Sequence, residues 1–575
     1  MFQNNISNIA DTLFVYFINY LIMFGGISWL LIGMLFGFCL ITGLLFANKV
    51  WGKGLIVFSL LCVLIQPALF YFPELIQNYG VTYRIYDDYI YQYIWGGLAT
   101  GVITLLGFSL YMSPIDKVKT NLLNRCNATT DTKTDIRTVE KHLPNTIHSY
   151  DPEVWMNSKK IFTGLNDKNK PSFLNEDVSN SHIHLMGTTG AGKTVEATNI
   201  LVQSINRGEA VIVIDPKNDE YLPHALGQAA KKKNVDFIYI DLLGDTPQFD
   251  PFYKKSVNEN EENLTAGFGL FDIGQASDFY KLYERKAARL FARHVYEETD
   301  NLVDVFTDFV TKNPVLQKEA PKFFEDLSEL LSLRVTHVTD GLNISDEIKR
   351  GSVIYVRGSL RNPRVLKLQK MFLMNVIHAC ENREREGSRR VRIFLDEFKF
   401  LISKPALEAL ASIRDKNASM ILANQSYGDL RSCPNDIDPE SVLTSVSENC
   451  SIKIVYKIRD PETAERLAKL SGTIQVPDEV LTLRPSKSLF SSNKPDISVR
   501  NTERYLIDTN MMLSLPKNCA VLYGDGQAEF IFISPMKVEK KPEYVKPTRF
   551  DLDYEIPNSH DVSITSIAEG LLDVD

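Results

Sequence analysis

An eight-residue motif, GTTGAGKT at residues 187–194, constrains the fold of this 575-residue chain more than any other feature. A short, largely apolar run ends at its first glycine, and residues 195–205 after it have the apolar spacing of a helix. A strand, a glycine-rich turn and a helix in this order form a phosphate-binding loop, in which backbone N–H groups point at phosphate oxygens. The sequence therefore predicts a nucleotide site at the end of a strand.

The side chains of this Walker A loop have separate expected roles. Lys193 is expected to reach the β- and γ-phosphates, and the Thr194 hydroxyl is placed to ligate Mg²⁺. We therefore predict ATP and Mg²⁺ as cofactors. The residues predicted to bind the nucleotide are Gly187, Thr188, Thr189, Gly190, Ala191, Gly192, Lys193 and Thr194.

A second motif, VRIFLDE at residues 391–397, is an apolar strand that ends in two carboxylates. A buried central strand of a parallel sheet would deliver both of them to its carboxyl end. Asp396 would hold the Mg²⁺ through water, and Glu397 would orient and deprotonate the attacking water. The alternative, a solvated start of a helix, fits less well because the phosphate loop precedes this motif and a similar strand follows it.

That later strand, residues 418–424, is followed by Gln425. A glutamine beside the phosphates can sense the γ-phosphate, although a buried, hydrogen-bonded amide is the commoner fate of such a residue. Arg414 lies just before this strand and could stabilise the transition state in a neighbouring subunit as an arginine finger. An ordinary surface arginine is an equally good interpretation from the residues alone.

Apolar residues are concentrated at the N-terminus. No charged residue occurs in residues 12–47, and the runs 27–47, 54–72 and 94–112 are each long enough to cross a bilayer. Lysines lie in residues 48–53, and basic residues follow the last run, so the positive-inside rule places both in the cytoplasm. Residues 12–47 form either one span or a hairpin, so we predict three or four spans and leave the side of the N-terminus open.

The rest of the chain alternates apolar strand-like runs with helical stretches, which predicts an open parallel sheet with helices on both faces. The alternation lapses in a charged, helix-patterned stretch, and the end of the chain is lysine-rich and then acidic. The predicted order is a transmembrane region (1–112), a linker (113–150), the first part of a nucleotide-binding domain (151–253), an all-α insertion (254–345), the second part (346–534) and a flexible acidic tail (535–575).

Charge and cysteine content exclude two other classes of protein. The net charge is −8, so this is not a generally basic nucleic-acid binder, and any DNA contact must be local. The seven cysteines are scattered without a C-x-x-C pair, so the sequence indicates neither a zinc site nor a disulfide framework.

The chain resembles the TraD/TraG-like coupling proteins of type IV secretion and conjugation, within the FtsK/HerA-like superfamily of RecA-fold motors. Besides the two nucleotide motifs, the resemblance rests on VIVIDPKNDE, FDPF, IRDKNASMILANQS and SENCSIKIVYKIRDPETAERLAKLSG. One departure is DPKND, where relatives more often carry a lysine and a glycine after the aspartate, and it leaves the roles of Asp215 and Lys217 open.

The resemblance implies a RecA-like motor domain, an all-α domain facing the cytosol and a homo-hexamer with nucleotide at the subunit boundaries. It implies a multi-pass location in the bacterial inner membrane. The net negative stretch near residues 73–93, which lies between two apolar runs, is then predicted to be a short periplasmic loop. The implied partners are DNA carrying a relaxase-type protein, single-stranded in the leading interpretation, and the components of a type IV secretion channel. Arg414 lies where the family has its interfacial arginine.

The leading hypothesis is an inner-membrane ATPase that recruits a relaxase–DNA substrate to a type IV secretion channel and pumps DNA by ATP hydrolysis during conjugation. Two alternatives stay open. One is a double-stranded DNA translocase for chromosome segregation, and the other is a docking receptor that binds ATP and barely hydrolyses it.

Overall fold

The computed structural model describes residues 139–550, apart from 146–148, 158, 176–177, 179, 273–275, 280, 299–300, 435–436 and 483–495, together with Gly54 and Val57. Contacts divide the chain into two units. The first comprises residues 1–131 and 475–502, and the second, which we call the motor unit, comprises 132–474 and 503–575.

The motor unit is built on an eleven-stranded sheet with the order β2-β1-β13-β12-β9-β3-β8-β7-β4-β6-β5. Every neighbouring pair from β9 to β5 is parallel, as the sequence predicted, whereas β12, β13, β1 and β2 add to it in antiparallel fashion. The strands are β1 (Ile161–Asn166), β2 (Pro171–Leu174), β3 (Ile183–Met186), β4 (Ala210–Asp215), β5 (Phe237–Asp241), β6 (Val353–Arg357), β7 (Val391–Leu395), β8 (Ala418–Asn424), β9 (Ile452–Val455), β12 (Cys519–Tyr523) and β13 (Glu529–Phe532).

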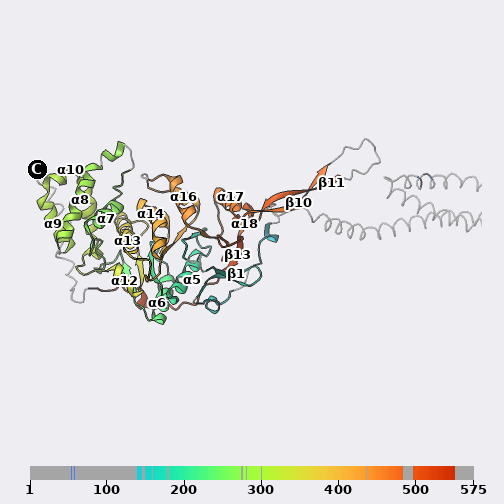
Figure 1. Cartoon of the computed structure of the whole chain (residues 1–575), viewed down its shortest axis with the longest axis horizontal. Helices are drawn as coiled ribbons and strands as arrows, with labels where there is room; N and C mark the ends of the chain where they lie inside the picture. The colour runs from blue at the N-terminus through green and yellow to red at the C-terminus, as the bar shows by residue number, and fades with distance from the viewer. Residues whose placement is uncertain are drawn as a thin grey trace, which may run out of the picture. The chain divides into compact units, whose positions relative to one another are not determined.

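Helices cover both faces of this sheet (Figure 1), which explains why its central strands are buried and mostly apolar. Along β4, Val211 and Val213 enter one core, where α5 (Lys193–Asn206) and α6 (Leu222–Lys233) pack. Ile212 and its neighbours on the other side enter a second core. The helices of that second core include α13 (Pro363–Glu381), α14 (Lys404–Ser412), α16 (Pro439–Asn449), α17 (Pro461–Leu470) and α18 (Thr509–Ser514).

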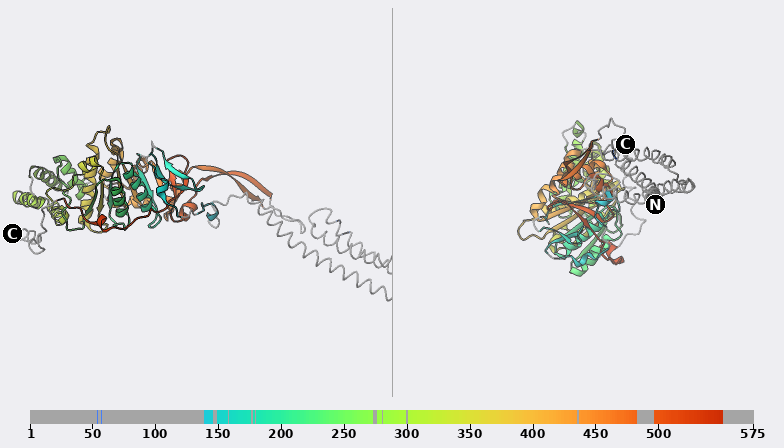
Figure 2. Two further views of the ribbon diagram at one scale, coloured as in Figure 1. Left: turned by 90° about the horizontal axis from the view of Figure 1, so that it is seen from below. Right: turned by 90° about the vertical axis from the view of Figure 1, so that its right-hand side faces the viewer.

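Between β5 and β6 the described residues form helices and loops only. These helices are α7 (Val257–Phe268), α8 (Leu282–Glu297), α9 (Leu302–Lys312), α10 (Pro314–Glu319), α11 (Pro321–Leu331) and α12 (Ile344–Arg350). Within the motor unit they gather at the end away from β1 and β13 (Figures 1 and 2). Their core is aromatic, since the ring of Phe291 packs edge-on against Phe252, Phe309 and Phe323 at centroid distances of 5.7, 5.2 and 6.3 Å.

Residues 535–550, which we call the C-terminal strap, lie across α6 and the edge strand β5. Thr548 exchanges hydrogen bonds with the backbone of Tyr239 in β5 (3.0 and 2.9 Å), and its carbonyl accepts from Gln248 Nε2 (2.7 Å). The Tyr544 ring packs against Gly227 of α6 and Phe237 of β5. The sequence placed the whole of 535–575 in a flexible tail; this part instead covers a sheet edge. Residues 551–575 lie outside the described part.

Strands β10 (Thr473–Thr482) and β11 (Asp496–Tyr505), most of whose residues belong to the other unit, pair in a two-stranded sheet. The predicted transmembrane region and most of the linker lie outside the described residues. Within the residues that the structure describes, no helix has both the length and the apolar character needed to cross a bilayer.

Replacing Gly227 by alanine should loosen the C-terminal strap. In an ordinary helix interior this change stabilises by roughly 1 kcal/mol, but here the new Cβ would lie 2.3 Å from Tyr544 Cδ1. We expect faster tryptic cleavage after Lys540 and Arg549, and no further increase when Tyr544 is already alanine. Unchanged cleavage together with a raised unfolding midpoint would show that the strap does not pack there.

Candidate nucleotide site

The parallel strands bring four sequence-distant loops to one edge of the sheet, which we call the carboxyl edge. Strands β3, β8, β7 and β4 are consecutive neighbours in the sheet, so the residues that follow them lie in a row. These residues are the phosphate loop after β3, Gln425 after β8, Asp396 and Glu397 after β7, and Pro216 to Asp219 after β4. Ligand sites in such sheets form at this edge.

The phosphate loop has a backbone that only glycine tolerates well. Gly187, Gly190 and Gly192 have φ values of +150°, +76° and +129°. Tyr456 packs directly beneath, so a Cβ on Gly187 would lie 2.6 Å from its Cβ, and one on Gly192 would lie 2.8 Å from its Cε1. The Tyr456 hydroxyl in turn donates to buried Glu196 Oε2 (3.3 Å). The packing of Tyr456 therefore fixes the shape of the phosphate loop in the absence of a ligand.

Lys193, the first residue of α5, is buried and donates to the carbonyls of Gly187 (2.5 Å) and Thr188 (3.2 Å). Burial lowers its pKa to about 8, with a further contribution from the positive charge of Lys217. A bound polyanion would favour the charged form of this side chain. Its position inside the loop fits the predicted phosphate-binding role.

The two carboxylates after β7 are both buried. Burial raises the pKa of Asp396 to about 6, against the opposing effect of Lys217. Glu397 has a left-handed backbone (φ +46°, ψ +55°), which is a strained conformation for a residue with a side chain. Such strain clusters at functional sites, and here it turns the chain sharply between β7 and the 3-10 helix at Phe398–Phe400.

Lys217 is the residue whose role the sequence left open. Its Nζ forms an ion pair with Glu397 Oε1 and lies 3.4 Å from Asp396 Oδ2. Burial lowers the pKa of Lys217, but the negative charges of Asp396 and Glu397 outweigh it and raise the pKa overall. The signal in the sequence was the lysine two residues after a strand-ending aspartate, but only the folded loop shows what it contacts.

Asp215 is fully engaged in holding the loop that carries Lys217. Its carboxylate accepts from the backbone N–H groups of Lys217 (2.8 Å), Asn218 (3.0 Å) and Asp219 (2.6 Å) and from the Tyr355 hydroxyl. The Tyr355 ring stacks on Tyr239 at a centroid distance of 5.4 Å. Asp215 therefore stabilises the loop. Both of its carboxylate oxygens accept hydrogen bonds there, so the structure assigns it to the loop and not to ligand binding.

Gln425 is half-buried and follows β8 beside the phosphate loop. Its backbone N–H donates to Asp429 Oδ2 (2.9 Å), and Lys399 Nζ donates to Oδ1 of the same carboxylate (3.3 Å). The preceding residue, Asn424, is the buried and satisfied amide of this pair, with His184 Nε2 2.5 Å from its Oδ1. Gln425 therefore lies near the site, whereas the buried amide of Asn424 has a structural role.

Arg414 is not brought together with the other predicted residues of its own chain. It is exposed in the 3-10 helix Ile413–Lys416, before the amino end of β8 and so at the opposite edge of the sheet. There it lines a cavity of about 400 Å³ with Arg385, Asp415 and Glu448 among others. An arginine in this place can serve a nucleotide only in another subunit.

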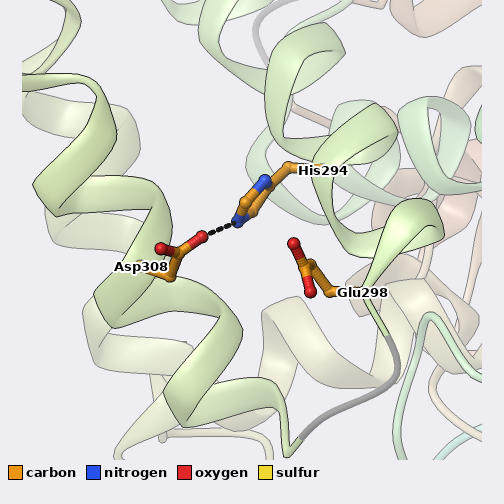
Figure 3. Close-up of side chains that lie close together, drawn as sticks. All are labelled: His294, Glu298 and Asp308. Atoms are coloured by element: carbon orange, nitrogen blue, oxygen red, sulfur yellow. Dashed lines mark ion pairs between the residues drawn. The ribbon is translucent and has the colours of Figure 1, made fainter.

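A cluster of possible metal ligands lies in the helical part, where His294 and Glu298 from α8 and its end face Asp308 of α9 (Figure 3). His294 Nε2 is 3.0 Å from Asp308 Oδ2. Lys312 Nζ reaches the same Asp308 oxygen at 2.6 Å and Glu298 Oε1 at 4.0 Å. Because this ammonium already offsets the carboxylate charge, we interpret the cluster as an ion-pair network that ties α8 to α9.

The residues at the carboxyl edge fit a magnesium nucleotide. The glycine-shaped loop and Lys193 offer donors to phosphate oxygens, and Thr194 and Asp396 offer the hard oxygen ligands that Mg²⁺ prefers. Glu397 Oε2 is buried without a hydrogen-bond partner among the described residues, so an acceptor is available for a water.

Comparisons with known proteins agree with the predicted resemblance. A family described as the TraM recognition site of TraD and TraG matches residues 390–517, and the type IV secretion-system coupling protein DNA-binding domain matches 173–224. Mobilization protein A of Escherichia coli is 27% identical over 361 residues, which are 62% of this chain and 66% of that protein. The match thus spans just under two thirds of the relative's own length.

Solved structures of the plasmid coupling protein TrwB share the fold. Its complex with ADP and Mg²⁺ has a TM-score of 0.52 at 15% identity and covers 68% of this chain and 93% of that one. An unbound form has a TM-score of 0.51 at 14% identity, with 70% and 97% covered. The predicted resemblance to type IV coupling proteins is confirmed, and the mixed α/β sheet resembles that of the TrwB structures.

Replacing Lys193 by alanine should remove most nucleotide affinity, because the buried charge that faces the phosphates is lost. We expect a loss of roughly 2–4 kcal/mol, which is about 30- to 1,000-fold in the dissociation constant of a fluorescent ATP analogue. Lys168→Ala, on the exposed turn between β1 and β2, is the matched control and should bind normally. Wild-type affinity in Lys193→Ala would contradict the site.

Proposed function

We propose that this chain, which is similar to the coupling proteins of type IV secretion systems, is a membrane-anchored ATP hydrolase that drives DNA into a secretion channel during conjugation. The observation that carries the proposal is the meeting of the phosphate loop, Asp396, Glu397 and Gln425 at one edge of a coupling-protein fold.

The hydrolytic step follows from the chemistry of the carboxyl edge. Lys193 and the loop amides would hold the phosphates, and Thr194 and Asp396 would hold Mg²⁺, which would offset the negative charge of the phosphates. Glu397 would take a proton from water as the water oxygen bonds to the γ-phosphorus, and the bond from that phosphorus to the ADP oxygen breaks. Gln425 would report loss of the γ-phosphate through its strand.

The position of Arg414 supports assembly into a ring, for which the family resemblance implies six subunits. Its own phosphate loop is at the far edge of the sheet, so a role in catalysis requires a nucleotide bound by a neighbouring copy. In a ring that binds nucleotide between subunits, each copy would supply Arg414 to the next and stabilise the charge that develops on the γ-phosphate.

The DNA substrate and the membrane location rest on the family resemblance and on the sequence. The family described as a coupling-protein DNA-binding domain matches part of the motor unit. The net charge of −8 favours a local contact, such as the lumen of a ring, over a wholly basic surface. The apolar runs before residue 113 would anchor the motor to the inner membrane, beside the channel that receives a relaxase-bound strand.

Replacing Glu397 by glutamine tests the hydrolytic step. The amide keeps the size of the side chain but is a very weak base, so phosphate release should fall about 100-fold or more while nucleotide affinity changes less than about threefold. Glu408→Gln, at an exposed position of α14, is the matched control.

Transfer of the conjugative substrate should fall in parallel in Glu397→Gln cells. If the variant released phosphate and delivered substrate at the wild-type rate, Glu397 would not be the base and the pumping proposal would fail. Loss of phosphate release with normal delivery would favour the docking receptor.

A further inference from the structure

The loop after β4 presents Lys217 from an unusually well-fixed backbone. Three consecutive backbone N–H groups donate to Asp215, and Asn218 adopts a left-handed conformation with φ +60°. Asp215 is itself held by the hydroxyl of buried Tyr355. Because the backbone is already fixed, the Cα of Lys217 has a defined position. Only the conformational freedom of its side chain is lost when the ammonium pairs with a carboxylate.

The far end of that side chain engages one oxygen of Glu397 and leaves the other unpaired. Lys217 Nζ forms an ion pair with Glu397 Oε1, whereas Oε2 has no ion pair among the described residues, and neither oxygen accepts a hydrogen bond from them. The backbone of Glu397 is held by its turn, and its side chain is buried. A general base that is oriented on one side and free on the other is the arrangement found when a third group positions a catalytic base.

Two other roles for Lys217 make different demands on the geometry. A phosphate ligand would direct its ammonium into the loop, as Lys193 does with the Gly187 and Thr188 carbonyls. A simple surface counter-charge would not need the fixed loop, and its partner would not be almost fully buried. Lys217 instead lies over the two carboxylates, with a third of its side chain exposed (33%) and Glu397 nearly enclosed (3%).

We propose that Lys217 is a positioning residue of the hydrolytic centre, which holds one carboxylate oxygen of Glu397 so that the other meets the attacking water. Asp215 and Tyr355 act indirectly, because they hold the loop that carries Lys217. This inference rests on the proposed hydrolysis, and it gives a role to the aspartate and lysine of the DPKND stretch.

A double-mutant cycle on the full-length protein tests whether Lys217 acts through Glu397. Lys217→Met keeps the apolar stem and should lower kcat about 10- to 100-fold, with the KM for ATP changed less than about threefold. In the Glu397→Gln background the same change should cost less than about twofold, because the group that Lys217 positions is no longer a base. Lys217→Arg should restore part of the loss.

Single-turnover hydrolysis of radiolabelled ATP gives the sensitivity that the double variant requires. Lys232→Met, at an exposed position of α6, is the matched control and should behave as wild type. If Lys217→Met cost the same factor in both backgrounds, or raised KM without lowering kcat, Lys217 would act independently of Glu397 and the inference would be overturned.

A carbodiimide cross-link tests the contact between Lys217 and Glu397 without requiring ATP hydrolysis. The reagent activates a carboxylate, the Lys217 amine displaces it to form an amide, and the carbodiimide leaves as its urea, having taken up the elements of water. We expect a peptide that joins Lys217 to Glu397 by mass spectrometry, and no such product in Glu397→Gln. Absence of the product from the wild type would also overturn the inference.

The outcomes separate the inference from the function on which it rests. If the wild type released no phosphate, the proposed function would fail, and the positioning role would fail with it even where the cross-link forms. If the wild type hydrolysed ATP and the two variants acted independently, only the role of Lys217 would fail.

Discussion

Parallel pairing of β3, β8, β7 and β4 is the constraint on which the site depends. Since each of these strands runs in the same direction and pairs with its neighbour in fixed register, the residues after them meet at one edge. The two apolar cores on either face hold the register, because a slip of one residue would move each side chain to the opposite face. The packing of the two cores therefore determines where the residues of the nucleotide site lie.

The electrostatics at this edge are balanced within a small volume. Lys193 and Lys217 carry positive charge toward Asp396 and Glu397, and burial raises the cost of leaving any of the four unpaired. Tyr456 fills the space beneath the phosphate loop and so excludes side chains from two of its glycine positions. The site is consequently preorganised by the chain itself, which is the condition for electrostatic stabilisation of a transition state.

The sequence predicted the central strands and the phosphate loop because buried parallel strands read as continuous apolar runs and the loop needs its glycines. It missed β1, β2 and β13, which belong to the antiparallel part of the sheet, and β1 is interrupted by Thr163 and by Gly164 at a break in register. The C-terminal strap was missed because its anchors, Tyr544 and Thr548, are isolated in a polar stretch. The contact of Lys217 with Glu397 depends on a loop shape that no local pattern encodes.

The most direct test of the central claim is phosphate release by purified full-length protein with Mg²⁺ and ATP, measured without DNA, with single-stranded DNA and with double-stranded DNA. The account predicts magnesium-dependent release that single-stranded DNA stimulates, and that is lost in Glu397→Gln. Stimulation by double-stranded DNA alone would favour the chromosome-segregation alternative. No release above the Glu397→Gln background under any of the three conditions would contradict the account.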